Sequence, residues 1–208
     1  MDQHTIEMIG AIIIAVITAL VGPAVLEYLK LKMSSSKDRD PVKKELEYSC
    51  IINEELEAIR EELKADRCWV SLYHNGGHFL HGKRSMQKFS VMFESSAPGV
   101  SGVGMIFSNI PVSLFSKAVE EIVKNKHIYI KDYDDPTVAT FGLKSGAEAT
   151  GTKSSYSVCL FDIISDETIG TIGIDYLKKT KLEVAQLIFL NEKSQRVAGF
   201  LANFIRSK

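Results

Sequence analysis

A run of 19 residues without a formal charge, from Met8 to Leu26, constrains this chain more than any other feature. A helix of roughly 20 apolar residues crosses the hydrocarbon core of a bilayer, and a charged residue at its centre costs about 3 kcal/mol. The alternative is a cleaved signal peptide, which begins with a basic segment. Here the leading segment, MDQHTIE, is acidic. We therefore expect residues 1–30 to anchor the chain in a membrane lipid bilayer through one transmembrane helix.

Basic residues follow this uncharged run, and none precedes it. They are Lys30, Lys32, Lys37, Arg39, Lys43 and Lys44. The cytoplasmic flanks of transmembrane helices carry an excess of Lys and Arg. The pattern therefore predicts that the rest of the chain lies in the cytoplasm.

The composition after the anchor is that of one ordinary domain. Residues 31–42 contain three serines and a proline and are typical of a short juxtamembrane linker. Residues 43–208 provide enough chain to bury one hydrophobic core. The 25 basic and 26 acidic residues nearly cancel, so we expect no nucleic-acid partner.

The spacing of apolar residues predicts the secondary structure. Residues 42–64, 110–125 and 181–205 show the 3-4 spacing of amphipathic helices. Five other segments are rich in β-branched and aromatic residues, which is typical of strands. They are residues 68–74, 88–95, 127–133, 156–163 and 168–177. About four polar residues separate the last two strands, so we expect a hairpin at the centre of an antiparallel sheet in an α+β fold.

Two connections are unusually long and rich in small residues. They cover residues 97–108 and 132–155. Loops of this length in a compact domain are usually functional lids or disordered segments. We expect them to flank a pocket.

The order of elements resembles a GAF domain over about residues 43–206. The local match is Tyr156 to Asp162, followed by Ile169-Gly170-Thr171-Ile172-Gly173-Ile174 and a terminal helix. The resemblance implies an antiparallel sheet of five to six strands, with the first and last helices on one face, where they often mediate dimerisation, and a ligand pocket on the other. The Asn-Lys-Phe-Asp-Glu signature of cyclic-nucleotide GAF domains is absent, and no cysteine has a bilin-attachment context.

A second resemblance is to the holins of large tailed phages. These have one N-terminal transmembrane helix and a soluble α/β domain that ends in a similar hairpin and helix, here with Tyr156-Ser157 and with Cys159 before Phe161. The soluble domain of those holins faces the periplasm, whereas the lysines here predict the cytoplasm. A phage-type holin, or another membrane or virion assembly protein, is the alternative hypothesis.

The segment Tyr73 to Lys83 contains three of the five histidines and the pair Gly76-Gly77. Imidazoles and an approachable glycine backbone favour a ligand site, whereas Asn75-Gly76 is equally typical of a structural turn. No nearby carboxylate or cysteine completes a tetrahedral metal site, so we predict no metal. The candidate ligand-binding residues are His74, Asn75, Gly76, Gly77, His78 and Asp162.

The remaining polar residues do not indicate catalysis. Asp162 and Asp175 lie on or beside the final hairpin, where such residues usually form hydrogen bonds at strand ends. Cys68 and Cys159 lie within strand patterns and are expected to be buried and inert.

We therefore expect a membrane-anchored, GAF-like sensory or interaction protein without catalytic activity or a cofactor. Its expected partners are the bilayer, a small-molecule ligand and further copies of itself, which associate through the 43–64 and 181–205 helices.

Overall fold

The computed structural model describes residues 41–75 and 87–206. The chain divides into two compact units, Met1–Glu47 and Tyr48–Lys208. Among the residues described, no helix combines the length and apolar character needed to cross a bilayer. The predicted transmembrane helix, with the uncharged run at residues 8–26, lies outside the described residues.

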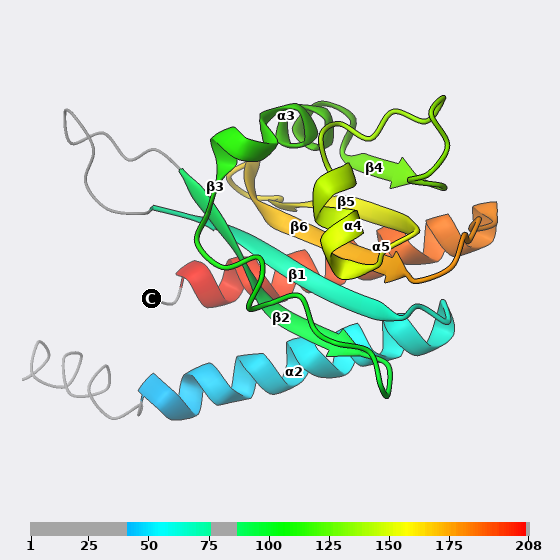
Figure 1. Ribbon diagram of the computed structural model, residues 1–208. Coiled ribbons are helices and arrows are strands. Elements are labelled where there is room, and N and C mark those ends of the chain that lie inside the picture. The colour runs from blue at the N-terminus through cyan, green and yellow to red at the C-terminus, as the bar shows by residue number, and fades with distance from the viewer. Residues whose placement is uncertain (1–40, 76–86, 207–208) are drawn as a thin grey trace, which may run out of the picture. The chain divides into compact units, whose positions relative to one another are not determined.

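One antiparallel sheet of six strands forms the centre of the second unit, in the order β3-β2-β1-β6-β5-β4 (Figure 1). The strands are β1 (Arg67–His74), β2 (Lys88–Ser96), β3 (Ile110–Pro111), β4 (His127–Ile130), β5 (Ser154–Asp162) and β6 (Glu167–Tyr176). The five predicted strands are all present, and the hairpin of β5 and β6 is confirmed. The short edge strand β3 was not predicted, because two residues are too few to show a period.

Helices cover both faces of this sheet (Figure 1). They are α2 (Pro41–Glu62), the 3-10 helix η1 (Val112–Phe115), α3 (Ser116–Asn125), α4 (Lys144–Thr150) and α5 (Val184–Arg206). From Tyr48 onwards α2 lies with α5 on one face, and α3 and α4 lie over the other face. The α+β, GAF-like arrangement expected from the sequence is confirmed.

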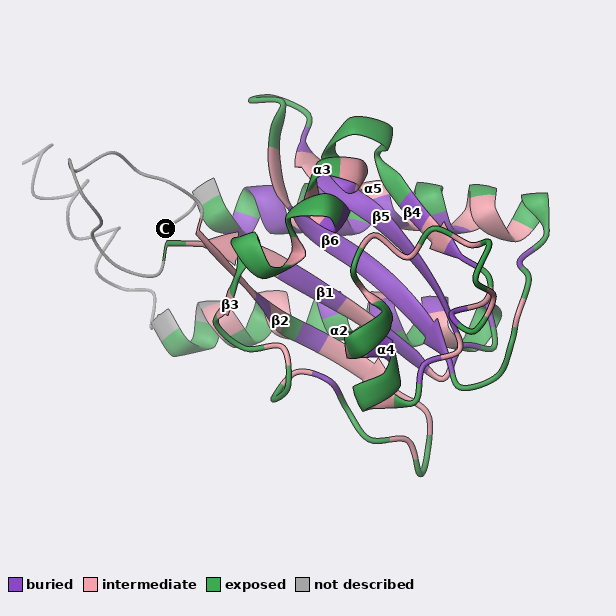
Figure 2. Cartoon of the chain, turned by 45° about the horizontal axis from the view of Figure 1, so that its top comes forward, coloured by how far each residue is buried: buried purple, intermediate pink, exposed green. Residues whose placement is uncertain are grey.

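An apolar core fills the space between the sheet and the pair α2 and α5. Its fully buried members include Ile52, Leu56, Ile59, Val70, Ile172, Ile174, Leu190 and Leu201. Figure 2 shows β5 and β6 buried along most of their length. Full burial of one such side chain stabilises the fold by about 1.5–3 kcal/mol. This core therefore supports the face of the sheet that packs against α2 and α5.

The sequence predicts an apolar stripe along one side of the last helix, made of Val184, Leu187, Ile188, Val197, Leu201, Phe204 and Ile205. The stripe is partly wrong. Val197, Leu201 and Phe204 are buried as predicted, whereas Val184 and Ile188 are 72% and 54% exposed. Leu190, which the stripe omits, is fully buried in the core between α5 and the sheet. Periodicity alone does not fix which edge of an apolar stripe packs against the sheet.

Two buried tyrosines of this core donate hydrogen bonds to backbone carbonyls near the ends of the helices. The hydroxyl of Tyr176 donates to the carbonyl of Leu63 at 2.8 Å, just after the end of α2. The hydroxyl of Tyr156 donates to the carbonyl of Thr180 at 2.8 Å, in the segment that precedes α5. Both hydroxyls are satisfied, as buried polar groups must be.

Candidate ligand pocket

On the face opposite α2 and α5, mostly small and polar residues of β1, β6 and β5 lie side by side in rows across the sheet. Cross-strand pairing aligns Arg67, Asp175 and Ser155 in one row, Trp69, Gly173 and Ser157 in a second, and Ser71, Thr171 and Cys159 in a third. Alternation along each strand sends the large apolar residues between them, such as Ile172 and Ile174, into the core on the other face. The surface of the sheet under α3 and α4 therefore carries mostly short side chains, many of which have hydroxyl groups.

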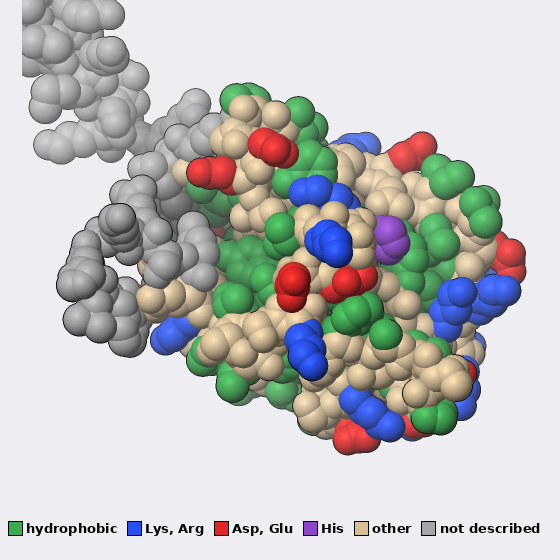
Figure 3. Space-filling view, turned by 90° about the horizontal axis from the view of Figure 1, so that it is seen from above, with side chains coloured by type: hydrophobic (Ala, Val, Ile, Leu, Met, Phe, Trp, Pro, Cys, Tyr) green, Lys and Arg blue, Asp and Glu red, His purple; other side chains and the backbone are tan. Residues whose placement is uncertain are grey.

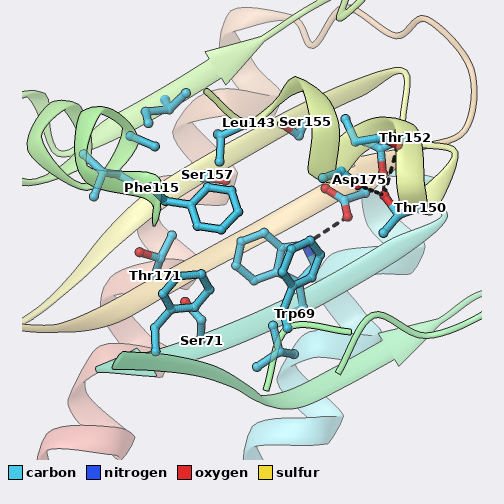
Figure 4. Close-up of a pocket in the computed structure, with 18 of the residues that line it drawn as sticks. Trp69, Ser71, Phe115, Leu143, Thr150, Thr152, Ser155, Ser157, Thr171 and Asp175 are labelled. Carbon is cyan, nitrogen blue, oxygen red and sulfur yellow. Dashed lines mark hydrogen bonds between the residues drawn. The ribbon is translucent and has the colours of Figure 1, made fainter. Parts of the chain in front are cut away.

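A cavity of about 130 Å³ lies on this surface. Its cover consists mostly of apolar side chains, among them Phe107, Phe115, Ala118, Leu143 and Ala147. Figure 4 shows Phe115 and Leu143 opposite the residues of the sheet. Both long segments predicted to flank a pocket contribute to the lining. For comparison, an engineered apolar cavity of about 150 Å³ binds benzene.

The position of Trp69 depends on a glycine of the neighbouring strand. A Cβ atom at Gly173 would lie 2.3 Å from Cζ2 of the Trp69 ring, which is closer than real contacts allow. The missing side chain lets the indole lie against β6. Its Nε1–H then donates a 3.1 Å hydrogen bond to Oδ2 of Asp175, drawn as the dashed line between these two residues in Figure 4.

Asp175 is a buried carboxylic acid in the cavity wall, with 6% of its surface exposed. Burial raises its pKa to about 6, against the opposing effects of the Trp69 hydrogen bond and the Arg67 charge. Nη1 of Arg67 lies 3.8 Å from Oδ2. The carboxyl group is therefore ionised at neutral pH but titrates in the mildly acidic range.

Arg67 joins the two segments beside the pocket to the sheet. Its Nε donates to the carbonyl of Ser101 at 2.8 Å, and its Nη2 donates to the carbonyl of Thr150 at 2.8 Å. Its Nη1 donates to Oγ1 of Thr152 at 3.2 Å. One buried guanidinium thus holds the 97–108 segment and the end of α4 in place.

The first of these segments has a second attachment. Oε1 of Glu94 accepts a 2.6 Å hydrogen bond from the Val103 amide, and Oε2 accepts one of 3.1 Å from the Gly104 amide. Val103 and Gly104 are therefore part of a turn whose amides bind the Glu94 carboxylate.

Hydroxyl groups at the cavity wall are paired with one another. The Tyr133 hydroxyl and Ser155 Oγ are 2.7 Å apart, and Thr150 Oγ1 and Thr152 Oγ1 are 2.9 Å apart. Burial raises the pKa of Tyr133. This phenol therefore stays protonated at neutral pH and is a neutral partner for a ligand.

The histidine segment predicted as a ligand site is described only at its start. His74 ends β1, where its Nε2 lies 2.9 Å from Oγ of Ser90. Strand alternation places His74 on the face opposite Tyr73, which lines the cavity. Asn75 is exposed, and Gly76, Gly77 and His78 lie outside the described residues. A ligand role for this segment stays a prediction.

Asp162 occupies the end of β5, away from the cavity lining. Its Oδ1 accepts a 2.9 Å hydrogen bond from the amide of Ile164, which stabilises the turn of the hairpin. This is the strand-end hydrogen bond that the sequence indicated. His74 and Asp162 lie toward the same end of the sheet, with β6 between their strands.

The pocket residues were not predicted from the sequence, although their spacing indicates them. In β5 and β6, small or polar residues alternate with large apolar ones. The small or polar set is Ser155, Ser157, Thr171, Gly173 and Asp175. When small or polar residues line one face of a central strand, the pattern indicates that this face of the sheet is not closely packed.

In the described part of the chain there is no cluster of metal ligands, and the two thiols of the sheet are not reactive. There, no group of three His, Cys, Asp or Glu side chains is placed to hold a metal ion. Cys68 and Cys159 are buried, as predicted, and burial raises the pKa of both thiols. A thiol with a raised pKa is a poor nucleophile.

The outer surface above the cavity carries no single sign of charge. Figure 3 shows Lys and Arg side chains interspersed with Asp and Glu, with apolar side chains between them. The charge that distinguishes the pocket is therefore inside it, on Asp175.

The fold and the pocket together define a GAF-like α+β domain. No family model and no curated protein matches the chain in sequence. Solved GAF domains match it in structure. The phycocyanobilin-bound GAF domain of a cyanobacterial phytochrome has a TM-score of 0.60 at 20% identity, over 78% of this chain and 88% of that chain.

Two further photoreceptor domains show the same likeness. GAF3 of Slr1393 from Synechocystis has a TM-score of 0.59 at 12% identity, over 76% of this chain and 97% of that chain. The GAF domain of PixJ from Thermosynechococcus elongatus, in its blue-light-absorbing form, has a TM-score of 0.58 at 14% identity, over 81% and 96% of the two chains. At these identities the likeness shows the fold alone.

Proposed function

We propose that this protein is a membrane-anchored, non-catalytic sensory module whose GAF-like domain binds a small molecule in the cavity above β1, β5 and β6. The observation that carries the proposal is the cavity itself. Apolar walls with a few placed polar groups are the usual character of small-molecule sites. Here the polar groups are the Asp175 carboxylate and hydroxyls such as those of Ser71, Ser157 and Thr171.

The cavity is better suited to recognition than to catalysis. Tyr133 and Ser155 are hydrogen-bonded to each other, and no histidine or cysteine lines the cavity among the described residues. Asp175 is held by Trp69 and lies near Arg67, an arrangement that fixes a charge rather than moving a proton. We therefore propose binding without a chemical step.

The ligand we propose is smaller than the bilin of the phytochrome domain. A bilin is a chain of four pyrrole rings, whereas about 130 Å³ is the size of a site for one ring. Neither described cysteine of the sheet, Cys68 or Cys159, lines the cavity. The shared fold thus supports ligand binding in general rather than a bilin.

The membrane and oligomer parts of the proposal rest on different residues. The uncharged run at residues 8–26 is the proposed anchor, and the lysines after it favour a cytoplasmic domain. The outer side of α5 carries the exposed apolar residues Val184, Ile188 and Ile205, which we propose pack against a second copy. Sedimentation of a chain that begins at Pro41 tests this, and a strictly monomeric result at all concentrations contradicts it.

Ligand binding is tested with the full chain in mild detergent and a set of neutral, cationic and anionic ring compounds of about six to twelve heavy atoms. We expect at least one compound to raise the unfolding midpoint of the wild type. Ala147→Leu fills the cavity and should abolish this increase. The matched control Ala149→Leu alters an exposed residue of the same helix and should keep it.

If no compound raises the midpoint of the wild type, or if Ala147→Leu responds like the wild type, the cavity is not the binding site. Ala118→Val, a smaller change in the cover, provides a second filling variant in case Ala147→Leu folds poorly. No feature of the described residues favours the holin alternative.

A further inference from the structure

The cavity holds one charged side chain. Among the described residues of its lining, Asp175 is the single acid, and no Lys, Arg or His is present. Arg67, the partner of Asp175 in the ion pair, is not part of the lining. A ligand in this cavity therefore meets negative charge at one place and apolar or hydroxyl groups elsewhere.

The acceptor capacity of this carboxylate is largely unused by the described residues. An ionised carboxylate has about four lone-pair sites for hydrogen-bond donors. Asp175 accepts from Trp69 Nε1, and the Arg67 Nη1 distance of 3.8 Å is too long for a hydrogen bond. The Arg67 nitrogens donate instead to Thr152 and to two carbonyl groups. A carboxylate that faces a cavity completes its hydrogen bonds with water or with a bound ligand.

Aromatic rings line the same cavity as this carboxylate. Trp69 and Tyr73 lie on β1, and Phe115 lies in the cover. The rings of Phe115 and Phe89 have centroids 5.8 Å apart and meet edge to face. Ring faces attract both planar ligands and cations. Figure 4 shows Trp69 and Phe115 on different sides of the cavity, with Asp175 at one end.

We propose that the cavity binds a compact planar cation of the amidinium or aminoheterocycle class, with its N–H groups on the Asp175 carboxylate and its ring between Trp69 and Phe115. This inference rests on the proposed function and names the chemical class of the ligand. A single ring with an attached amidinium matches both the small volume and the single negative charge. Two parallel N–H groups also suit the geometry of a carboxylate.

Three probes of one shape test the assignment. Benzamidine, benzamide and benzoate share a ring and a planar substituent and differ in charge. With the full chain in detergent at pH 7.5, isothermal titration calorimetry should show benzamidine binding at least 10-fold more tightly than benzamide. Benzoate should give no binding. Quenching of Trp69, the single tryptophan of the chain, should follow the same order.

Asp175→Asn removes the charge and keeps the shape. We expect it to weaken benzamidine at least 10-fold and to leave benzamide within about 3-fold of the wild type. The ranking of the three probes on the wild type needs no variant, so it decides the question even if Asp175→Asn folds poorly.

The outcomes separate this inference from the proposed function. If benzamide or a neutral ring binds as tightly as benzamidine, the preference for a cation is overturned while binding in the cavity stands. If benzamidine does not bind but neutral members of the compound set do, the result is the same. If none of the three probes and no other compound of the set binds, the inference and the proposed function both fail.

Discussion

Trp69 and Asp175 are joined across two neighbouring strands by a 3.1 Å hydrogen bond from the indole N–H to a carboxylate oxygen. The pairing register places Trp69 opposite Gly173 rather than opposite Asp175, so the indole must cross the position of Gly173 to reach the acid. The contact therefore depends on Trp69 of β1 and on two residues of β6 that follow it by about 100 positions. It also places the one tryptophan of the chain in the cavity wall, where its fluorescence reports on the pocket.

Gly173→Ala should displace this indole. The added Cβ would lie within 2.7 Å of three ring atoms, so the ring must move and the bond to Asp175 is lost. We expect the free energy of unfolding to fall by about 1–3 kcal/mol. The tryptophan emission should also shift. Urea unfolding and the emission maximum measure the two effects.

Gly199→Ala is the matched control for this substitution. Gly199 lies in α5, and a Cβ atom there has no neighbour within 4 Å. Replacing a helical glycine by alanine typically stabilises by about 0.5–1 kcal/mol. If Gly173→Ala behaves like this control, the crowding of Trp69 is not what fixes the pocket.

Asp175 should make stability depend on pH in an unusual direction. Its pKa is raised from 3.8 to about 6 by burial, with Trp69 and Arg67 opposing and Glu94 and Asp66 adding to the shift. Between about pH 4 and pH 6 the folded state keeps a proton that the unfolded chain has released. The contribution of this residue therefore falls as pH rises through that window and is constant above it.

The measurement compares urea unfolding of the wild type and Asp175→Asn at pH 4, 5, 6 and 7.5. Other carboxylates cancel in this difference. We expect the stability of the wild type relative to the variant to fall by about 3 kcal/mol across the window. A difference that is constant, or that rises with pH, would show that pairing with Arg67 outweighs burial.

Arg67→Lys should loosen the two segments beside the pocket. An ammonium group cannot reproduce the three separately directed hydrogen bonds to Ser101, Thr150 and Thr152. We expect a loss of about 2–4 kcal/mol in unfolding free energy. Hydrogen exchange should become faster in residues 97–104 and 147–153.

A second arginine provides the control for this change. Arg196 pairs with Glu55 at 2.9 Å, but its side chain is 58% exposed. Arg196→Lys should change stability by less than about 0.5 kcal/mol because exposed ion pairs contribute little. Equal effects of the two substitutions would refute the role given to Arg67.

Local sequence patterns were sufficient for most of the fold. The 3-4 spacing of Ile52, Leu56 and Ile59 in α2 arises from the burial of one face of the helix. The period of two in β5 and β6 arises because one face of these strands packs on the core and the other lines the cavity. The short helix α4 was missed because its sequence, KSGAEAT, has small residues and little apolar periodicity. It forms where the chain covers the cavity, and this is a tertiary effect.

The pocket was less predictable than the fold for a physical reason. A residue such as Asp175 gains its properties from cross-strand neighbours, and the pairing of β1 with β6 joins positions that are about 100 apart in sequence. The histidine segment stands out in the sequence because its unusual residues are adjacent. The chemistry of the cavity is instead distributed over alternate positions of three strands.

The orientation of the proposed anchor can be tested by fusing reporters after Lys208. The lysine-rich flank that follows residue 26 predicts that a C-terminal green fluorescent protein is fluorescent in a bacterium and that a C-terminal alkaline phosphatase is inactive. Deleting residues 1–30 should release the fusion from the membrane fraction. Replacing Lys30, Lys32 and Lys37 by Gln, with three lysines added before Met8, should shift activity toward the phosphatase. Phosphatase activity in the unmodified fusion would place the domain on the outer side and contradict the cytoplasmic assignment.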